Sequence, residues 1–165
     1  MYFYLKKEGF NYQLFNRSKE VIMNAKWIKK NQPSSKKNSL IQTLVVFNSD
    51  KSIFLSSFLQ PNNSFIRLSW NEKYIVHIDC HEYVISCINY WKGIWEMKLG
   101  CSTFRYQAKF WDEQIIIHKD DTPILNIKND SIYFNKQEPS LTDLQIGISI
   151  YLTINNHWQV SEIMY

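Results

Sequence analysis

Residues 139–154, Pro-Ser-Leu-Thr-Asp-Leu-Gln-Ile-Gly-Ile-Ser-Ile-Tyr-Leu-Thr-Ile, form the longest apolar stretch of this 165-residue chain. They follow about ten short segments that are rich in Ile, Val, Tyr, Phe and Trp and typical of β-strands. Turn-forming residues separate these segments at intervals of about 8 to 12 residues, which is typical of all-β sandwiches and barrels. This order predicts a sheet wrapped around one buried C-terminal element.

The sequence gives two conflicting signals for the conformation of that last element. Apolar residues alternate with small or polar ones from 146 to 154, which on periodicity alone indicates a strand. Pro139 and Ser140, with Asp143 three residues further on, instead indicate a helix start, because the hydroxyl can cap a free amide and the carboxylate complements the helix dipole. A helix buried on every side needs no amphipathic pattern. We predict a helix over 141–154; a strand there would favour an open sandwich or a lipocalin-like barrel.

Strand patterns cover most of the remaining chain. The clearest is 104–111, where apolar side chains alternate with Arg105, Gln107 and Lys109, so that one face is buried and the other is solvated. A single long loop is expected at 31–38, and nothing marks an internal boundary, so we predict one domain over 1–165. The predicted strands are 2–6, 12–15, 21–28, 40–47, 52–59, 65–70, 74–80, 83–90, 94–98, 104–111, 114–118, 124–127 and 132–135.

Size and composition describe a packed globule. Ten Phe, ten Tyr and six Trp accompany only four Gly, and a chain of this length buries roughly two thirds of its unfolded surface. Cys80, Cys87 and Cys101 lack the paired spacing of a zinc site or a redox dithiol, so we expect small core residues in a reducing compartment. The N-terminus has no cleavable apolar region, and no run approaches the ~18 apolar residues of a membrane span. These features predict a cytoplasmic protein.

Charge is distributed unevenly along the chain. Residues 1–51 hold ten Lys and Arg against three acids, a net of +7, whereas the remaining 114 residues have a net charge of −3. Five lysines cluster around Trp27, and such a group can attract the negative charge of a membrane surface or another phosphate-bearing partner. The alternative is a solvated positive face that only keeps the protein soluble. The predicted anion-binding residues are Lys26, Lys29, Lys30, Lys36 and Lys37.

A metal site is the second candidate. His77, Asp79 and His81 are spaced two apart in a predicted strand, so their side chains would share one face and could ligate zinc or iron. Neighbours on a strand face are about 6.5 to 7 Å apart, so all three would have to bend inward, and polar residues on a solvated face explain the pattern equally well.

Catalytic motifs are missing from the sequence. It has no Gly-x-Ser-x-Gly elbow, phosphate loop or His-Glu-x-x-His helix, and its adjacent acids stand in turn contexts. We therefore expect neither an enzyme nor a cofactor. Nucleic acid is a disfavoured partner, because most aromatic residues alternate with polar ones as core groups do.

The layout resembles the tubby C-terminal-like superfamily, which includes the phospholipid scramblases. The resemblance depends on the hairpin over 12–23, the paired strands at 104–111 and 113–118, and the end segment 142–156. It covers nearly the whole chain as a pattern and implies a closed barrel of about twelve strands around an apolar C-terminal helix. The isoleucine alternation departs from the leucine- and alanine-rich helix of that family. The resemblance also implies contact with phosphoinositide headgroups through basic side chains.

These observations predict a noncatalytic binding module. The first hypothesis is contact with anionic lipid headgroups or another phosphate ligand through the N-terminal lysines, at the periphery of a membrane. The second is a protein-interaction module of immunity or adaptor type that uses a β edge or an aromatic patch. The third, a hydrophobic-ligand carrier, requires the C-terminal segment to be a strand. The richness in Asn, Ile and Lys would suit an AT-rich bacterial genome.

Overall fold

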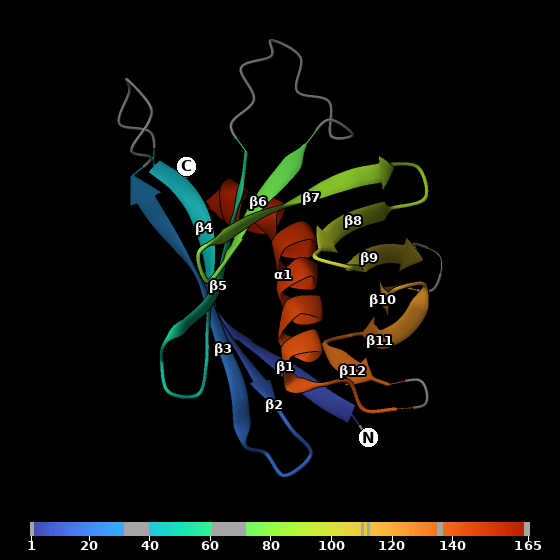
Figure 1. Cartoon of the computed structure of the whole chain (residues 1–165). Coiled ribbons are helices and arrows are strands. Elements are labelled where there is room, and N and C mark those ends of the chain that lie inside the picture. The colour runs from blue at the N-terminus through green and yellow to red at the C-terminus, as the bar shows by residue number, and fades with distance from the viewer. Residues whose placement is uncertain are drawn as a thin grey trace.

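The C-terminal segment is a helix inside a closed barrel, as predicted. In a computed structural model, α1 (Leu141–Ile163) occupies the lumen of an antiparallel barrel of twelve strands, and Figure 1 shows the strands wrapped around it. The structure describes residues 2–31, 40–60, 72–109, 111, 113–134 and 137–163, with the side chains of 2, 30, 31, 40, 41 and 156–163 left out.

Each strand pairs with the one before it, and β1 closes the barrel against β12. All the pairs are antiparallel, so successive turns alternate between the two ends of the barrel. The bounds are β1 Tyr2–Glu8, β2 Asn11–Phe15, β3 Val21–Asn31, β4 Leu40–Phe47, β5 Ile53–Leu59, β6 Lys73–Ile78, β7 His81–Asn89, β8 Ile94–Leu99, β9 Ser102–Lys109, β10 Gln114–Lys119, β11 Thr122–Lys128 and β12 Ser131–Tyr133.

We name the two ends of the barrel by their turns. The polar mouth comprises the turns at 16–20, 48–52, 79–80, 100–101 and 120–121, and α1 begins there. The aromatic mouth comprises the turns at 9–10, 90–93 and 129–130 and the β9–β10 connection, and α1 runs toward it.

Burial of α1 on all sides explains why its sequence has no helical periodicity. Every side chain from Leu144 to Ile154 is buried, because the barrel wall surrounds this part of the helix. The wall approaches closely at Gly147, where an added Cβ would lie 2.7 Å from Leu125 Cδ1. The alternation from 146 to 154 therefore does not indicate a strand. A helix shows a 3.6-residue hydrophobic period only when one of its faces is exposed to solvent, and this segment has no such face.

Polar contacts fix α1 within the barrel. Ser140 Oγ accepts a hydrogen bond from the Asp143 amide at 3.1 Å, as the sequence predicted for the cap. The Lys119 ammonium contacts the Asp143 carboxylate at 2.9 and 3.0 Å. Deeper inside, the hydroxyls of Ser57 and Thr153 lie 2.6 Å apart. These contacts with Lys119 and Ser57 help to set the axial position of the helix, which apolar packing alone specifies weakly.

Several sequence predictions need correction. The strand predicted at 74–80 ends at Ile78, because Asp79, with a φ of 54°, and Cys80 form a turn. The expectation of core cysteines is wrong for Cys80 and Cys101, which are exposed in turns, and Cys87 is half-buried. The predicted strand 65–70 and most of the predicted loop 31–38 lie outside the described residues.

Candidate binding surfaces

The predicted lysine cluster is divided between two faces of β3. Lys26 is exposed on the outer wall, next to the buried Trp27. Lys29 falls on the same alternation as Trp27, which points inward, and is exposed because it lies near the strand end at the aromatic mouth. These two lysines therefore do not form one site. The remaining members lie outside the described side chains: Lys30, Lys36 and Lys37.

Lys26 does contribute to a polar pocket on the outer wall. This outer-wall pocket has a volume of about 300 Å³ and spans β1, β2, β3 and β4. Strand register creates it, because Asn11 lies opposite Lys26 and Gln13 lies opposite Asn24. The Gln13 side-chain amide donates to Asn24 Oδ1 at 3.2 Å. The lining residues are Lys6, Glu8, Asn11, Tyr12, Gln13, Asn24, Ala25, Lys26 and Phe47.

One acid moderates the charge of the outer-wall pocket. Lys6 Nζ lies 2.6 Å from Glu8 Oε1, and this hydrogen bond raises the pKa of Lys6 and lowers the pKa of Glu8. Both side chains are more than half exposed, so the pair contributes little to stability. With Lys26 the pocket carries a net charge of +1, together with amide groups that can donate hydrogen bonds to an anion.

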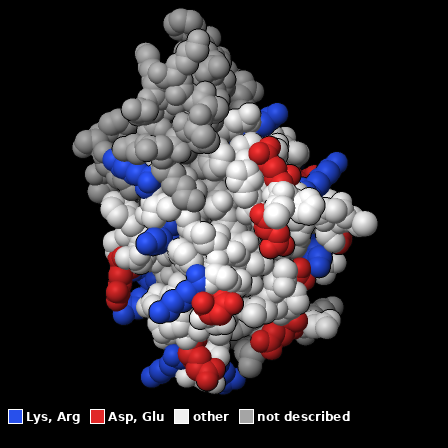
Figure 2. Space-filling model, turned by 60° about the vertical axis from the view of Figure 1, so that its left-hand side comes forward, with Lys and Arg blue, Asp and Glu red and all other residues white. Residues whose placement is uncertain are grey.

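The outer surface as a whole carries mixed charge. Figure 2 shows Lys and Arg side chains interspersed with Asp and Glu on the side that carries β3, β4 and β5 in Figure 1. The net charge of +7 in residues 1–51 therefore does not produce one continuous basic face in this view. Local pockets, not overall charge, distinguish one part of this wall from another.

The aromatic mouth exposes large apolar side chains that sequence analysis did not identify. Trp91 is 83% exposed in the β7–β8 turn, and Trp111 is 100% exposed in the β9–β10 connection. The Ala108 amide donates to the Gly93 carbonyl at 3.0 Å, which places these two connections side by side, as they lie in Figure 1. Tyr90 packs edge-on against Trp91 with ring centroids 5.8 Å apart. Tryptophans within turns, next to Lys92-Gly93 and Asp112-Glu113, were the signal available in the sequence.

An aromatic pocket of about 310 Å³ lies beside Trp91, between the barrel wall and the end of the buried part of α1. Burial raises the pKa values of Tyr74 and Tyr106, because the surrounding side chains keep water from the phenols and disfavour the charged form. The described lining is Tyr74, Tyr90, Trp91, Gly93, Trp95, Tyr106, Ala108 and Ile154.

At the polar mouth, a groove of about 640 Å³ runs along the start of α1 and the β11 strand. Asp143 in its lining is paired with Lys119, and the Ser140 hydroxyl caps the helix. These polar groups therefore serve the attachment of α1.

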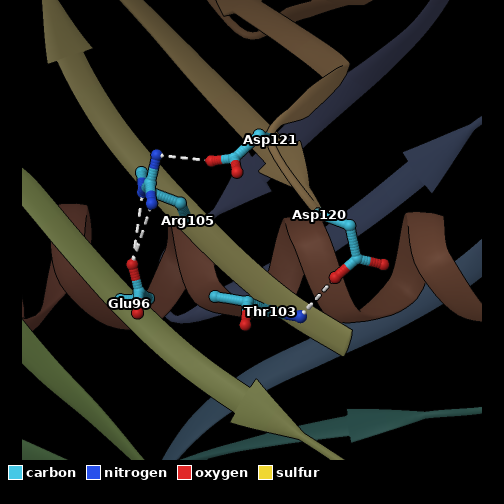
Figure 3. A network of polar contacts seen from close by, with 5 residues as sticks. All are labelled: Glu96, Thr103, Arg105, Asp120 and Asp121. Atoms are coloured by element: carbon cyan, nitrogen blue, oxygen red, sulfur yellow. Dashed lines mark hydrogen bonds and ion pairs between the residues drawn. The ribbon is translucent and has the colours of Figure 1, made fainter. Parts of the chain in front are cut away.

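An ionic cluster surrounds Arg105 on the outside of β9 (Figure 3). The Arg105 guanidinium donates to Glu96 at 3.2 Å and to Asp121 at 2.8 Å. Asp120 accepts from the Thr103 amide at 2.7 Å, and its own amide donates to the Thr103 carbonyl. Two acids surround the single cation, so this cluster fastens the β10–β11 turn to β9 and has no excess positive charge for an anion.

The three residues of the predicted metal site do not share a strand face. The turn at 79–80 places His77 on β6 and His81 on β7. His77 faces outward and lies 3.2 Å from Glu82, whereas His81 lies opposite the inward-facing Ile78 in the register. Within the part of the chain that the structure describes, no group of three His, Cys, Asp or Glu side chains could hold a metal ion.

Comparison with known proteins identifies no relative: no family model, curated protein or solved structure matches this chain. Among the described residues, no helix combines the length and hydropathy needed to cross a membrane.

Proposed function

We propose that this protein is a noncatalytic binding module that binds a phosphate-bearing anion, such as an anionic lipid headgroup, in the outer-wall pocket. The observation that carries the proposal is the convergence of Lys6 and Lys26 with side-chain amides in one concavity. Ammonium groups attract phosphate as point charges, and amide donors add directional hydrogen bonds. No catalytic role is assigned to the pocket, since its described lining holds no nucleophile paired with a base.

The filled lumen of the barrel leaves only its outer surface and its two mouths for a ligand. Side chains of α1 fill the barrel beside the wall residues, so the condition that the carrier hypothesis required, a C-terminal strand and an open lumen, is not met. A ligand must therefore bind to the outer wall or at a mouth. Phosphate would compete with Glu8 for Lys6, so binding involves a rearrangement of that exposed pair.

Two probes test this proposal. Inorganic pyrophosphate, followed by backbone NMR shifts, reports on free phosphate; flotation with phosphatidylcholine vesicles, with and without phosphatidylserine, reports on a headgroup. We expect Lys26→Glu to weaken binding about tenfold, since each lysine near an anionic surface contributes roughly 1 kcal/mol and this change also adds a negative charge. Lys98→Glu, on the exposed outside of β8, is the control for the charge change.

Salt provides an independent check, because contacts between lysine and phosphate weaken steeply as ionic strength rises. If pyrophosphate leaves the resonances of the pocket unchanged and flotation does not depend on acidic lipid, the proposal fails.

A protein-interaction module is the second candidate, and the exposed Trp91 and Trp111 are the observation that favours it. Tryptophan and tyrosine are enriched at the centres of protein interfaces. A β edge cannot serve, since each of the twelve described strands pairs on both sides. A partner would have to use the aromatic mouth.

A further inference from the structure

Trp91 takes no part in the hydrogen bonds of the turn that carries it, and the Trp111 side chain is fully exposed. In the β7–β8 turn, the Gly93 amide donates to the Tyr90 carbonyl at 3.0 Å, and the Lys92 amide donates to the Asn89 side chain at 3.0 Å. Backbone groups and Asn89 therefore hold this turn, and the Trp91 ring takes no part in these bonds. Adjacent exposed aromatic side chains that the fold does not require mark an interaction surface.

The residues around this surface distinguish between possible partners. On the wall formed by β6 to β11, the aromatic mouth carries four lysines against three acids, whereas the acidic residues Asp79, Asp120 and Asp121 occupy the turns of the polar mouth. Lysine stems can lie along an apolar surface while their ammonium groups reach outward. Among the residues that the structure describes there, these charges are Lys73, Lys92, Lys109 and Lys128 against Glu72, Glu113 and Asp130.

We propose that Tyr90, Trp91 and Trp111, with Ile88 beside them, form a surface that inserts into the interfacial layer of an anionic membrane. Tryptophan and tyrosine favour the headgroup level, where the ring is apolar and its polar edge stays hydrated, and the neighbouring lysines meet anionic lipid. Both tryptophans lie in connections at the aromatic mouth, and the hydrogen bond from Ala108 to Gly93 places these connections side by side. This inference rests on the proposed function and adds the apolar contact that the outer-wall pocket does not supply.

The experiment uses the full chain and vesicles of phosphatidylcholine and phosphatidylserine. We expect the variant with Trp91→Ala and Trp111→Ala together to partition into these vesicles at least about tenfold more weakly, because burial of a single large apolar side chain is worth roughly one to two decades. The control combines Ile53→Ala and Leu141→Ala, two exposed apolar residues near the polar mouth, and should partition as the parent does. Both variants remove exposed side chains, so both should fold.

A second measurement records insertion directly. Phosphatidylcholine brominated on its acyl chains should quench the tryptophan fluorescence of the parent more than that of the Trp91→Ala and Trp111→Ala variant. Equal partitioning of parent and variant, or equal quenching, would overturn the insertion. Such a result would leave phosphate binding in the outer-wall pocket intact, because pyrophosphate binding by the variant is measured separately. Failure of pyrophosphate and acidic vesicles alike to bind the parent would overturn both proposals.

Discussion

Both mouths of the barrel consist of connections between antiparallel strands, but the side chains in these connections differ between the two mouths. At the polar mouth, Asn16 and Asn48 accept or donate hydrogen bonds across their own turns, and Asp120 does so between β9 and the β10–β11 turn. At the aromatic mouth, the corresponding connections expose Trp91 and Trp111, and the Trp91 ring takes no part in the hydrogen bonds that hold the β7–β8 turn. The comparison teaches that the residues of one mouth serve folding, whereas the aromatic residues of the other are available for binding.

The largest expected difference is in the free energy of unfolding, between the replacement of a core tryptophan and that of an exposed one. Trp27→Ala should lower the free energy of unfolding by about 3–5 kcal/mol, because this ring is 3% exposed and its removal leaves a cavity. Trp111→Ala should change it by less than about 0.5 kcal/mol, because a fully exposed ring loses no packing. Urea unfolding of both variants measures the difference. A large loss for Trp111→Ala would show that the aromatic mouth is structural after all.

A smaller effect is expected at the polar mouth. Asn48→Ala should destabilise the protein by about 1–3 kcal/mol, because Asn48 accepts from the side chain of the buried Gln145 at 3.2 Å and its loss leaves that donor without this partner. Ser49→Ala changes an exposed residue in the same turn and provides the matched control. If the two variants unfold at the same urea concentration, the turn does not anchor α1.

The helix cap should contribute about 1 kcal/mol, which Ser140→Ala would remove. The reason is the hydrogen bond from the Asp143 amide to the Ser140 hydroxyl. Thr142→Ala, at an exposed position in the first turn, is the control. Thermal and urea unfolding of this pair tests whether α1 depends on its local start signal or only on packing in the lumen.

Tyrosine burial inside the barrel predicts a pH dependence of stability that appears only in strong base. Burial raises the pKa values of Tyr12 and Tyr151 to about 12. An unfolded chain ionises its tyrosines near pH 10, so between about pH 10 and 12 the unfolded state holds fewer protons and the free energy of unfolding falls as pH rises. The phenolate absorbance of the folded protein should therefore show a delayed component that is missing in guanidinium. Identical titration curves for the folded and unfolded protein would contradict this expectation.

Local sequence signals predicted most of the fold. Alternation over 104–111 located β9 to within two residues, and the Asn16 to Lys19 segment located a turn. Trp111, however, lies beyond the end of β9, because alternation does not mark the residue at which pairing with β8 and β10 ends. His77 and His81 were assigned to one strand for a similar reason: Asp79-Cys80 carries no strong turn residue such as glycine or proline, yet Asp79 adopts a positive φ.

The candidate sites were less predictable. Lysine clustering in the sequence indicated Lys26 and Lys29, but β3 turns them to opposite faces. The pocket that Lys26 lines needs Lys6 from β1 and Asn11 from β2, and only strand register brings these residues together. The proximity of the two connections that carry Trp91 and Trp111 likewise depends on the contact between Gly93 and Ala108, which are distant in sequence.

The sequence by itself determined the strands, most of their turns and the start of α1, because these depend on period-2 alternation, turn chemistry and capping within a few residues. Tertiary structure decided that residues with strand-like alternation at 146–154 form a helix, since the closed barrel surrounds this segment with apolar wall and leaves it no partner strand. It also decided which exposed residues meet at the outer-wall pocket and at the aromatic mouth. These residues come together through the pairing register of strands that are distant in sequence, and no local sequence pattern specifies that register.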